Sequence, residues 1–207
     1  MSSVFSHDSL DIIRKILYQK STKMEVMEIE SKKRNFRKES LKRLKKASSI
    51  GYYKKDKMIL QYLYQLISRE NAQHILLYIP LKIEVNLYPL IVQLRKEKKK
   101  LYVPFMEGKS FRVVKYRLPL STKLFGVKEP NDSKQYRKRK IDIAIVPIVG
   151  TDATLRRVGF GKGMYDRYFE KNHKNINKVV FVARELCYSQ EIVTDYYDVK
   201  ADILIVP

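Results

Sequence analysis

The residues best suited to hold an anion lie in one glycine-rich segment in the last third of the chain. Gly159, Gly161 and Gly163 remove side chains at alternating positions, so backbone N–H groups there can approach a ligand closely. Arg157 and Lys162 add positive charge beside them. The helix expected to follow directs the positive end of its dipole toward the same place. The pattern predicts a phosphate-binding loop, although three such glycines alone would equally suit a tight turn.

A second pair of cations lies far upstream, in a segment rich in helix-forming residues. Lys33 and Arg37 are four residues apart, so both lie on one face of a helix, where like charges repel each other. At ~100° per residue they fall along the same stripe as Phe36, Leu41 and Leu44. We therefore expect both cations to point toward the protein body, where a bound anion would offset their repulsion. A solvated basic helix is the alternative, and it suits the neighbouring lysines better.

Two carboxylates are placed where ligands gather in open α/β sheets, beyond the carboxyl ends of strands. Glu84 follows a short apolar run that ends at Pro80. It either contacts a ligand or merely favours the start of the next helix. Asp166 lies just behind the glycines, where it can bind Mg²⁺ directly or through water, or serve only as a first-turn carboxylate.

The elements that must position these residues alternate between strand and helix. Strands are predicted at 74–79, 101–105, 111–116, 141–149, 178–182 and 202–206. Helices are predicted at 23–46, 57–68, 87–96 and 165–171, with Gly51 as a stop signal after the first. The nearly continuous β-branched run at 141–149 is typical of a strand buried on both faces of a parallel sheet. The alternation predicts a three-layer α/β fold, with a mostly parallel central sheet and helices on both faces, in a Rossmann-like arrangement.

Length and composition indicate one domain preceded by a short extension. The 207 residues are 44% hydrophobic, enough to bury a single core. Leu10, Ile13 and Leu17 have helical spacing but precede the residues that carry chemistry. We therefore predict that residues 1–22 form an accessory N-terminal extension and residues 23–207 a single α/β domain.

The glycine-rich segment resembles the signature of the 5-formyltetrahydrofolate cyclo-ligases, also called methenyltetrahydrofolate synthetases. Its twelve residues read Arg157-Val158-Gly159-Phe160-Gly161-Lys162-Gly163-Met164-Tyr165-Asp166-Arg167-Tyr168. Further matches occur in that family's order, at Lys33-x-x-x-Arg37, Glu84, Phe125–Pro130, Val146–Gly150 and Asp198-x-x-x-Asp202. The resemblance covers about residues 30 to 207. Two departures are Met164, where many members have Tyr, and the segment Arg184–Cys187.

The resemblance implies an enzyme that uses ATP and Mg²⁺ to convert 5-formyltetrahydrofolate into 5,10-methenyltetrahydrofolate, ADP and phosphate. Catalysis would fall to Lys162 and Arg157. The nucleotide would be bound by Lys33, Arg37, Arg157, Gly159, Phe160, Gly161, Lys162, Gly163, Met164 and Tyr165. The folate would be bound by Glu84, Phe160, Gly161, Lys162, Gly163 and Met164. Asp166 and Asp198 would bind the metal, whereas Asp202 more plausibly borders the last strand.

The charge balance favours anionic partners without choosing among them. The chain has 43 basic and 22 acidic residues and a net charge of +21. The basic runs at 95–100 and 134–140 read mainly as solvated surface, and the scattered tyrosines do not suggest a base-stacking platform. A nucleic-acid-binding protein and a different sugar-phosphate or acyl-transfer enzyme are the rivals. Neither accounts for the cation pair, Glu84 and the glycine loop together.

The remaining features predict a cytoplasmic protein, which we expect to be a monomer although the sequence does not determine its oligomeric state. No apolar run approaches the ~20 residues that a membrane-spanning helix needs, and charges interrupt the first thirty residues. Cys187 is the only cysteine, so no internal disulfide can form, and we expect a small buried side chain there. The three histidines lack carboxylate or thiol neighbours at ligand spacing, which argues against a zinc site or a Ser-His-Asp triad. We expect 5-formyltetrahydrofolate, with or without a polyglutamate tail, as the partner, and no nucleic acid.

Overall fold

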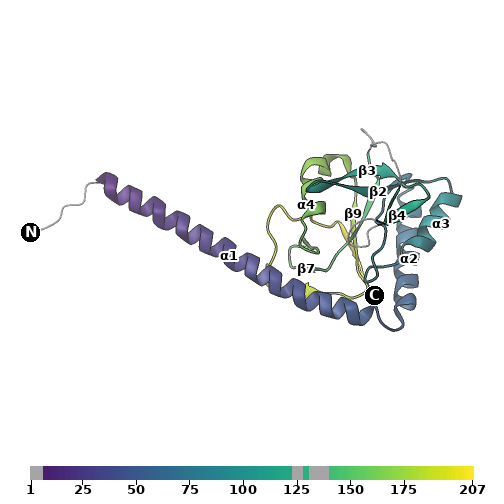
Figure 1. Ribbon diagram of the computed structural model, residues 1–207, viewed down its shortest axis with the longest axis horizontal. Helices are drawn as coiled ribbons and strands as arrows, with labels where there is room; N and C mark the ends of the chain where they lie inside the picture. The colour runs from purple at the N-terminus through teal and green to yellow at the C-terminus, as the bar shows by residue number, and fades with distance from the viewer. Residues whose placement is uncertain (1–6, 123–127, 131–139) are drawn as a thin grey trace, which may run out of the picture.

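The computed structural model describes residues 7–122, 128–130 and 140–207, with side chains from Met27 onward (Figure 1). Its helices are α1 (His7–Ala47), α2 (Tyr52–Arg69), α3 (Tyr88–Lys96), α4 (Met164–Asn172) and the short 3₁₀ helix η2 (His173–Asn175). The strands of its central sheet are β1 (His74–Leu76), β2 (Lys100–Glu107), β3 (Ser110–Lys115), β6 (Ile143–Pro147), β9 (Val179–Val182) and β11 (Ile203–Ile205). The minor strands are β4 (Leu120–Thr122), β5 (Lys128–Pro130), β7 (Gly150–Asp152), β8 (Arg157–Val158) and β10 (Tyr188–Ser189).

A six-stranded sheet in the order β11-β9-β6-β1-β2-β3 forms the centre of the protein. Only β3, at one edge, is antiparallel to its neighbour, and the other pairs are parallel. After β1 the chain places β2 on one side of it and later places β6 on the other. The chain therefore leaves the neighbouring strands β1 and β6 in opposite directions along the sheet. In open α/β sheets, ligands bind at such a point, in the crevice beyond the carboxyl ends of the strands.

Alternate residues of the strands enter two different cores, one on each face of the sheet. Ile75 and Leu77 pack with Leu63 of α2 in the core beneath α2 and α3. Leu76 packs with Phe169 of α4 in the core that α4 and the end of α1 cover. Helices therefore lie on both faces, and the predicted three-layer, mostly parallel α/β fold is confirmed.

Helix α1 is 41 residues long, and its first part projects away from the body of the protein (Figure 1). Its later part packs on the sheet through Phe36, Leu41 and Leu44. This confirms the orientation predicted for the apolar stripe. The helix passes through residue 22 without a break, and the division into an extension and a domain stays a prediction.

The prediction that Gly51 stops the first helix is wrong. Helix α1 ends at Ala47, where Ser48 N–H bonds the Leu44 carbonyl at 3.0 Å and the chain begins to turn. Gly51 instead precedes the first residue of α2 with a φ of 68°. A left-handed residue is needed there because the chain reverses direction between two helices.

The minor strands were not predicted, because they are two or three residues long and, unlike the equally short β1 and β11, do not lie in an apolar run. The predicted strand at 141–149 is also shorter in the structure, where β6 ends at Pro147 and β7 begins at Gly150 in a second sheet, ordered β10-β7-β8. This second sheet positions the site, because β8 carries Arg157 back beside the carboxyl end of β6.

Candidate active site

A cavity of about 650 Å³ opens where α1, the glycine-rich loop, the start of α4 and the loop before Val199 meet. Its lining includes most of the charged residues that the sequence singled out: Lys33, Arg37, Arg157, Lys162, Asp166 and Asp198. Gly159, Gly161 and Gly163 also line it. Tertiary folding thus brings together two motifs that are more than 120 residues apart, since Arg37 Nε donates to the Gly159 carbonyl at 2.8 Å.

Arg157 forms the floor beneath the glycine-rich loop. Its side chain is only 5% exposed, and its Nε donates to the Pro147 carbonyl at 3.0 Å. A Cβ on Gly159 would lie 2.2 Å from Arg157 Nη1, so only glycine permits this close approach. The guanidinium also lies 4.7 Å from the centroid of the Tyr165 ring and 3.9 Å from Asp166 Oδ2. This positive charge is therefore fixed in place before any ligand binds.

The loop joins α4 through a left-handed residue. Gly163, with a φ of 59°, precedes the first residue of α4, and no side chain caps the helix. The first N–H groups of such a helix lack intrahelical partners. Arg167 holds the loop in place through two hydrogen bonds. It donates to the carbonyl of Lys162 in the loop and, from Nε, to the carbonyl of Lys109 at 2.6 Å. The predicted phosphate-binding loop therefore has a defined backbone conformation at a helix N-terminus.

The two cations of α1 reach the cavity, as predicted from their place along the apolar stripe. Lys33 Nζ forms an ion pair with Asp198 Oδ2. Burial is the main cause that lowers the pKa of Arg37, and the nearby guanidinium of Arg157 acts in the same direction while Asp198 and Asp166 oppose it. A guanidinium stays protonated in proteins, so the poorly solvated charge of Arg37 would gain from a bound anion.

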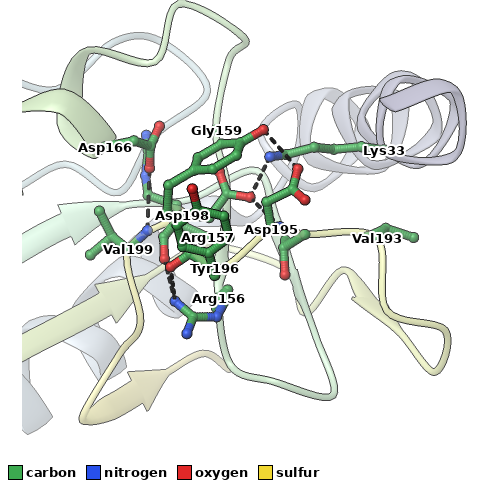
Figure 2. A network of polar contacts seen from close by, with 12 residues as sticks. Lys33, Arg156, Arg157, Gly159, Asp166, Val193, Asp195, Tyr196, Asp198 and Val199 are labelled. Atoms are coloured by element: carbon green, nitrogen blue, oxygen red, sulfur yellow. Dashed lines mark hydrogen bonds and ion pairs between the residues drawn. The ribbon is translucent and has the colours of Figure 1, made fainter. Parts of the chain in front are cut away.

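Two carboxylates line the cavity, Asp166 from the first turn of α4 and Asp198 from the loop before Val199 (Figure 2). Asp198 is 4% exposed and accepts bonds on Oδ2 from Lys33 and from the Asp195 N–H, the latter at 2.8 Å. Burial raises the pKa of Asp198, and Asp166 adds to the rise, whereas Lys33 opposes it. Asp166 accepts a long bond of 3.4 Å from the Val199 N–H. Among the residues that the structure describes, no group of three or more His, Cys, Asp or Glu side chains could hold a metal ion.

Glu84 does not line this cavity. It lies in the loop after β1, and its Oε2 accepts a bond from the Leu81 N–H at 2.8 Å. Helix α3 begins at Tyr88 with no acidic residue in its first turn, so Glu84 lies outside the turn where a carboxylate favours a helix start. Burial raises the pKa of Glu84 to about 7, against the opposing pull of the Leu81 N–H, Arg157 and Arg184. The charge of Arg157 thus lowers the pKa of Glu84, and Arg157 also lines the cavity.

The side chains of three more predicted ligand residues pack against the core instead of lining the cavity. Phe160, Met164 and Tyr165 are partly buried against the core shared by α1 and α4, and they are not part of the cavity lining. Burial, and then the charge of Glu84, raises the pKa of Tyr165. These side chains form an apolar region next to the charged cavity, because Arg157, which lines the cavity, lies over the Tyr165 ring.

Sequence reasoning missed several residues of the cavity: Glu30, Arg34, Arg167, Glu170, Tyr196 and Tyr197. Arg34 lies within the Lys33-x-x-x-Arg37 motif, Arg167 lies within the glycine-rich motif, and Tyr196 and Tyr197 directly precede Asp198. Adjacency to a motif was thus the signal that could have found them.

Arg184, in the segment Arg184–Cys187 that departs from the family pattern, forms a buried ion pair with Asp56 that the sequence did not predict. Arg184 Nε and Nη2 bond the two oxygens of Asp56 at 2.7 and 2.8 Å. The same pair holds the Glu84 loop, because Arg184 Nη1 donates to the Lys82 carbonyl and Asp56 Oδ2 accepts from the Asn86 N–H, both at 3.0 Å. Cys187, in the same segment, is buried as predicted.

Some predicted features lie outside the described residues. These are the basic run at 134–139 and the first part of the Phe125–Pro130 motif, up to residue 127. Asp202, by contrast, precedes β11 and accepts a bond from the Val179 N–H at 2.7 Å, which confirms that it borders the last strand. No helix in the described part of the chain combines the length and apolar character needed to cross a membrane.

Comparison with known proteins identifies the same family in sequence and in structure. The sequence model of the 5-formyltetrahydrofolate cyclo-ligase family matches residues 29–207. A 5-formyltetrahydrofolate cyclo-ligase of Haemophilus influenzae is 24% identical over 166 residues, which cover 76% of this chain and 89% of the relative. The solved 5,10-methenyltetrahydrofolate synthetase of Aquifex aeolicus superposes with a TM-score of 0.67 at 28% identity, over 84% of this chain and 89% of that one. A Mycoplasma pneumoniae 5,10-methenyltetrahydrofolate synthetase has the same fold, with a TM-score of 0.61 at 23% identity, over 84% of this chain and 97% of that one.

Proposed function

The chain belongs to the enzymes of the 5-formyltetrahydrofolate cyclo-ligase family, and from this premise we propose that it converts 5-formyltetrahydrofolate into 5,10-methenyltetrahydrofolate with ATP and Mg²⁺. The observation that carries the nucleotide part of the proposal is the cationic cavity around the glycine-rich loop. Six cationic side chains and four carboxylates line it: Lys33, Arg34, Arg37, Arg157, Lys162 and Arg167 against Glu30, Asp166, Glu170 and Asp198. Such a lining suits a polyanion with an associated divalent cation.

The chemistry explains why a phosphate site is needed beside a folate site. The formyl oxygen is bonded like an amide oxygen and is a poor leaving group. ATP supplies the phosphoryl group that turns this oxygen into a leaving group. N10 of the folate then attacks the formyl carbon, loses its proton, and the ring closes as the oxygen departs with phosphate. No nucleophile from the protein is needed.

The residues of the cavity supply position and positive charge for this transfer. Phosphoryl transfer depends mainly on alignment and on neutralising charge around the moving group. Arg157 suits this role because its charge is held rigidly beneath Gly159, and Lys162 suits it because it lies on the loop itself. Lys33 and Arg37 approach from α1 and would act more on nucleotide affinity than on the chemical step.

The carboxylates of the cavity fit Mg²⁺ rather than a metal held by protein ligands alone. Mg²⁺ is commonly bound by one or two carboxylates together with water and substrate phosphates. Asp166 is the better placed ligand, because Asp198 already shares its Oδ2 with Lys33 and the Asp195 N–H. When bound with the nucleotide, the metal would neutralise charge on phosphate oxygens.

We assign the folate to the side of the loop that faces Glu84. Glu84 is partly buried, and the apolar side chains of Phe160 and Met164, which belong to the glycine-rich loop and the start of α4, are partly buried against the core. An aromatic ring system needs such apolar surface together with a few polar contacts. Arg157 lines the cavity, and its charge lowers the pKa of Glu84. Its positive charge would therefore act on the bound nucleotide and on the carboxylate that contacts the folate.

One assay tests the proposed reaction directly. The near-ultraviolet absorbance of the methenyl product is followed with purified protein and 5-formyltetrahydrofolate, with and without ATP, and with Mg²⁺ or a chelator. We expect turnover only when ATP and metal are both present. Equal rates without ATP would exclude phosphorylation of the formyl oxygen.

A second assay separates the roles of two lysines. We expect Lys162→Ala to lower kcat by about a hundredfold, because a contact that strengthens in the transition state is lost. Lys33→Ala should act mainly on the KM for ATP, and it should also lower stability, because the buried carboxylate of Asp198 loses its partner. The reverse order of the two kcat effects would mean that the roles are exchanged.

We further propose that the enzyme is a cytoplasmic monomer without a nucleic-acid partner. The buried, solitary Cys187 is consistent with a reducing compartment. The excess charge would then act by steering anionic substrates, an effect that salt weakens. A sequence-selective RNA or DNA complex that survives ~0.2 M salt would contradict this view.

A further inference from the structure

Two exposed aromatic side chains stand at the rim of the phosphate cavity. Tyr196 is 86% exposed and Tyr197 is 48% exposed, and both line the same cavity as the glycine-rich loop. Exposed aromatic surface gains free energy when a ligand covers it. The proposed reaction assigns no role to either ring.

The loop that carries these rings is held firmly. The Tyr197 hydroxyl donates to Asp195 Oδ2 at 2.7 Å, and Lys33 Nζ lies 5.5 Å from the centroid of the Tyr197 ring. Arg156 Nη1 donates to the Tyr196 carbonyl at 2.9 Å and to the Asp198 carbonyl at 2.7 Å (Figure 2). The backbone at the rim is thus bonded by Arg156, which directly precedes β8, and its side chains are contacted by Lys33 of α1.

The two rings support each other at an angle. Their centroids are 5.5 Å apart and their planes differ by 77°, an edge-to-face arrangement. One ring therefore braces the other, and the 86% exposed ring of Tyr196 remains open to solvent. A braced, exposed ring beside a charged cavity is suited to a ligand that has a planar ring at one end and phosphates at the other.

We propose that Tyr196, braced by Tyr197, stacks against the nucleobase of the nucleoside triphosphate while its phosphates occupy the glycine-rich loop. This inference rests on the proposed use of ATP and adds the base-binding subsite. The folate is the other planar ligand of the reaction. The folate is expected to share the loop glycines with the nucleotide, but its proposed contact Glu84 does not line this cavity, whereas the tyrosines do. The nucleotide is therefore the ligand that can contact the tyrosine rings with its base and the glycine-rich loop with its phosphates.

Stacking has a consequence for selectivity. Every base offers a π face, so an aromatic platform contributes affinity while discriminating little between bases. We therefore expect GTP to compete with ATP for this cavity within about tenfold in affinity.

The test compares ATP with tripolyphosphate, which has phosphates but no base. Dissociation constants of both ligands are measured by calorimetry with Mg²⁺ on the full chain and on Tyr196→Ala, Tyr196→Phe and the double variant Tyr196→Ala/Tyr197→Ala. We expect Tyr196→Ala to weaken ATP binding by about tenfold and to leave tripolyphosphate binding unchanged. Tyr196→Phe should bind ATP like the wild type. Tyr62→Ala, on α2 and 54% exposed outside the cavity, is the matched control and should change neither constant.

Several results would overturn the inference, and each differs from a failure of the proposed reaction. ATP affinity that is unchanged in the double variant would show that the rings do not touch the base. An equal loss for tripolyphosphate would show that the rim acts on the phosphates alone. A rise only in the KM for 5-formyltetrahydrofolate would place the folate on the rings instead. In all three cases the wild type would still turn over with ATP, whereas a wild type that binds no ATP would refute the proposed reaction as well.

Discussion

Replacing Glu84 by Gln should make the ligand-free protein more stable at pH 8 and leave its stability almost unchanged near pH 4. Burial raises the pKa of Glu84 from an ordinary value of 4.5 to about 7. Between these two values the folded state keeps a proton that the unfolded state has released. The stability of the wild type must therefore fall as the pH rises from about 4.5 to about 7. Glutamine does not ionise, and its amide oxygen can still accept the bond from the Leu81 N–H.

The size of the effect follows from the same shift. Each pKa unit corresponds to about 1.4 kcal/mol, so a rise from 4.5 to about 7 corresponds to about 3 kcal/mol in the free energy of unfolding above pH 7. For a domain of this length, that free energy is equivalent to an increase of about 6–12 °C in Tm. The gain should be half complete near pH 6 and absent below pH 4.5, where Glu84 is protonated in both states.

The assay is urea and thermal unfolding of the wild type and Glu84→Gln at intervals from pH 4 to pH 8.5, without ligands. Glu39→Gln on α1 is the matched control, because this exposed side chain stays in contact with water when the protein folds. Its effect on stability should not follow the same pH curve. A difference between Glu84→Gln and the wild type that is constant across the pH range, or a variant that is less stable at pH 8, would refute the burial of this carboxyl group.

Three further changes test the site and its support. Gly159→Ala places a Cβ 2.2 Å from Arg157 Nη1, so the buried guanidinium must move, and we expect kcat/KM to fall by about a hundredfold; wild-type kinetics would contradict the close approach. Asp56→Ala leaves the buried Arg184 without its carboxylate and should lower the free energy of unfolding by about 3–5 kcal/mol in urea titrations, and a cost below ~1 kcal/mol would show that water replaces the pair. Asp166→Asn should unfold like the wild type but lose most activity at limiting Mg²⁺, and normal activity there would return Asp166 to a structural role.

The fold class could be predicted because it depends on short-range patterns. The β-branched run of β6 and the alternation of strands with helices required helices on both faces of a mostly parallel sheet. The spacing of Lys33 and Arg37 along an apolar stripe likewise required both side chains to face the body. These are properties of neighbouring residues, and a helical or extended period expresses them directly in the sequence. The role of Gly51 and the end of β6 at Pro147 could not be predicted, because local turns there compete with the continuing period.

Only the tertiary structure decided which charges compensate one another. Lys33 and Asp198 are 165 residues apart, and nothing in their local sequence indicates that each is the other's partner. The same holds for Asp56 and Arg184, which are separated by 128 residues and together hold the Glu84 loop. The burial of Arg157 beneath Gly159 likewise depends on β8 returning to the end of β6. Periodicity predicts which face of an element is buried, but the pairing of buried charges depends on how separate elements pack, and that information becomes visible only when the chain is folded.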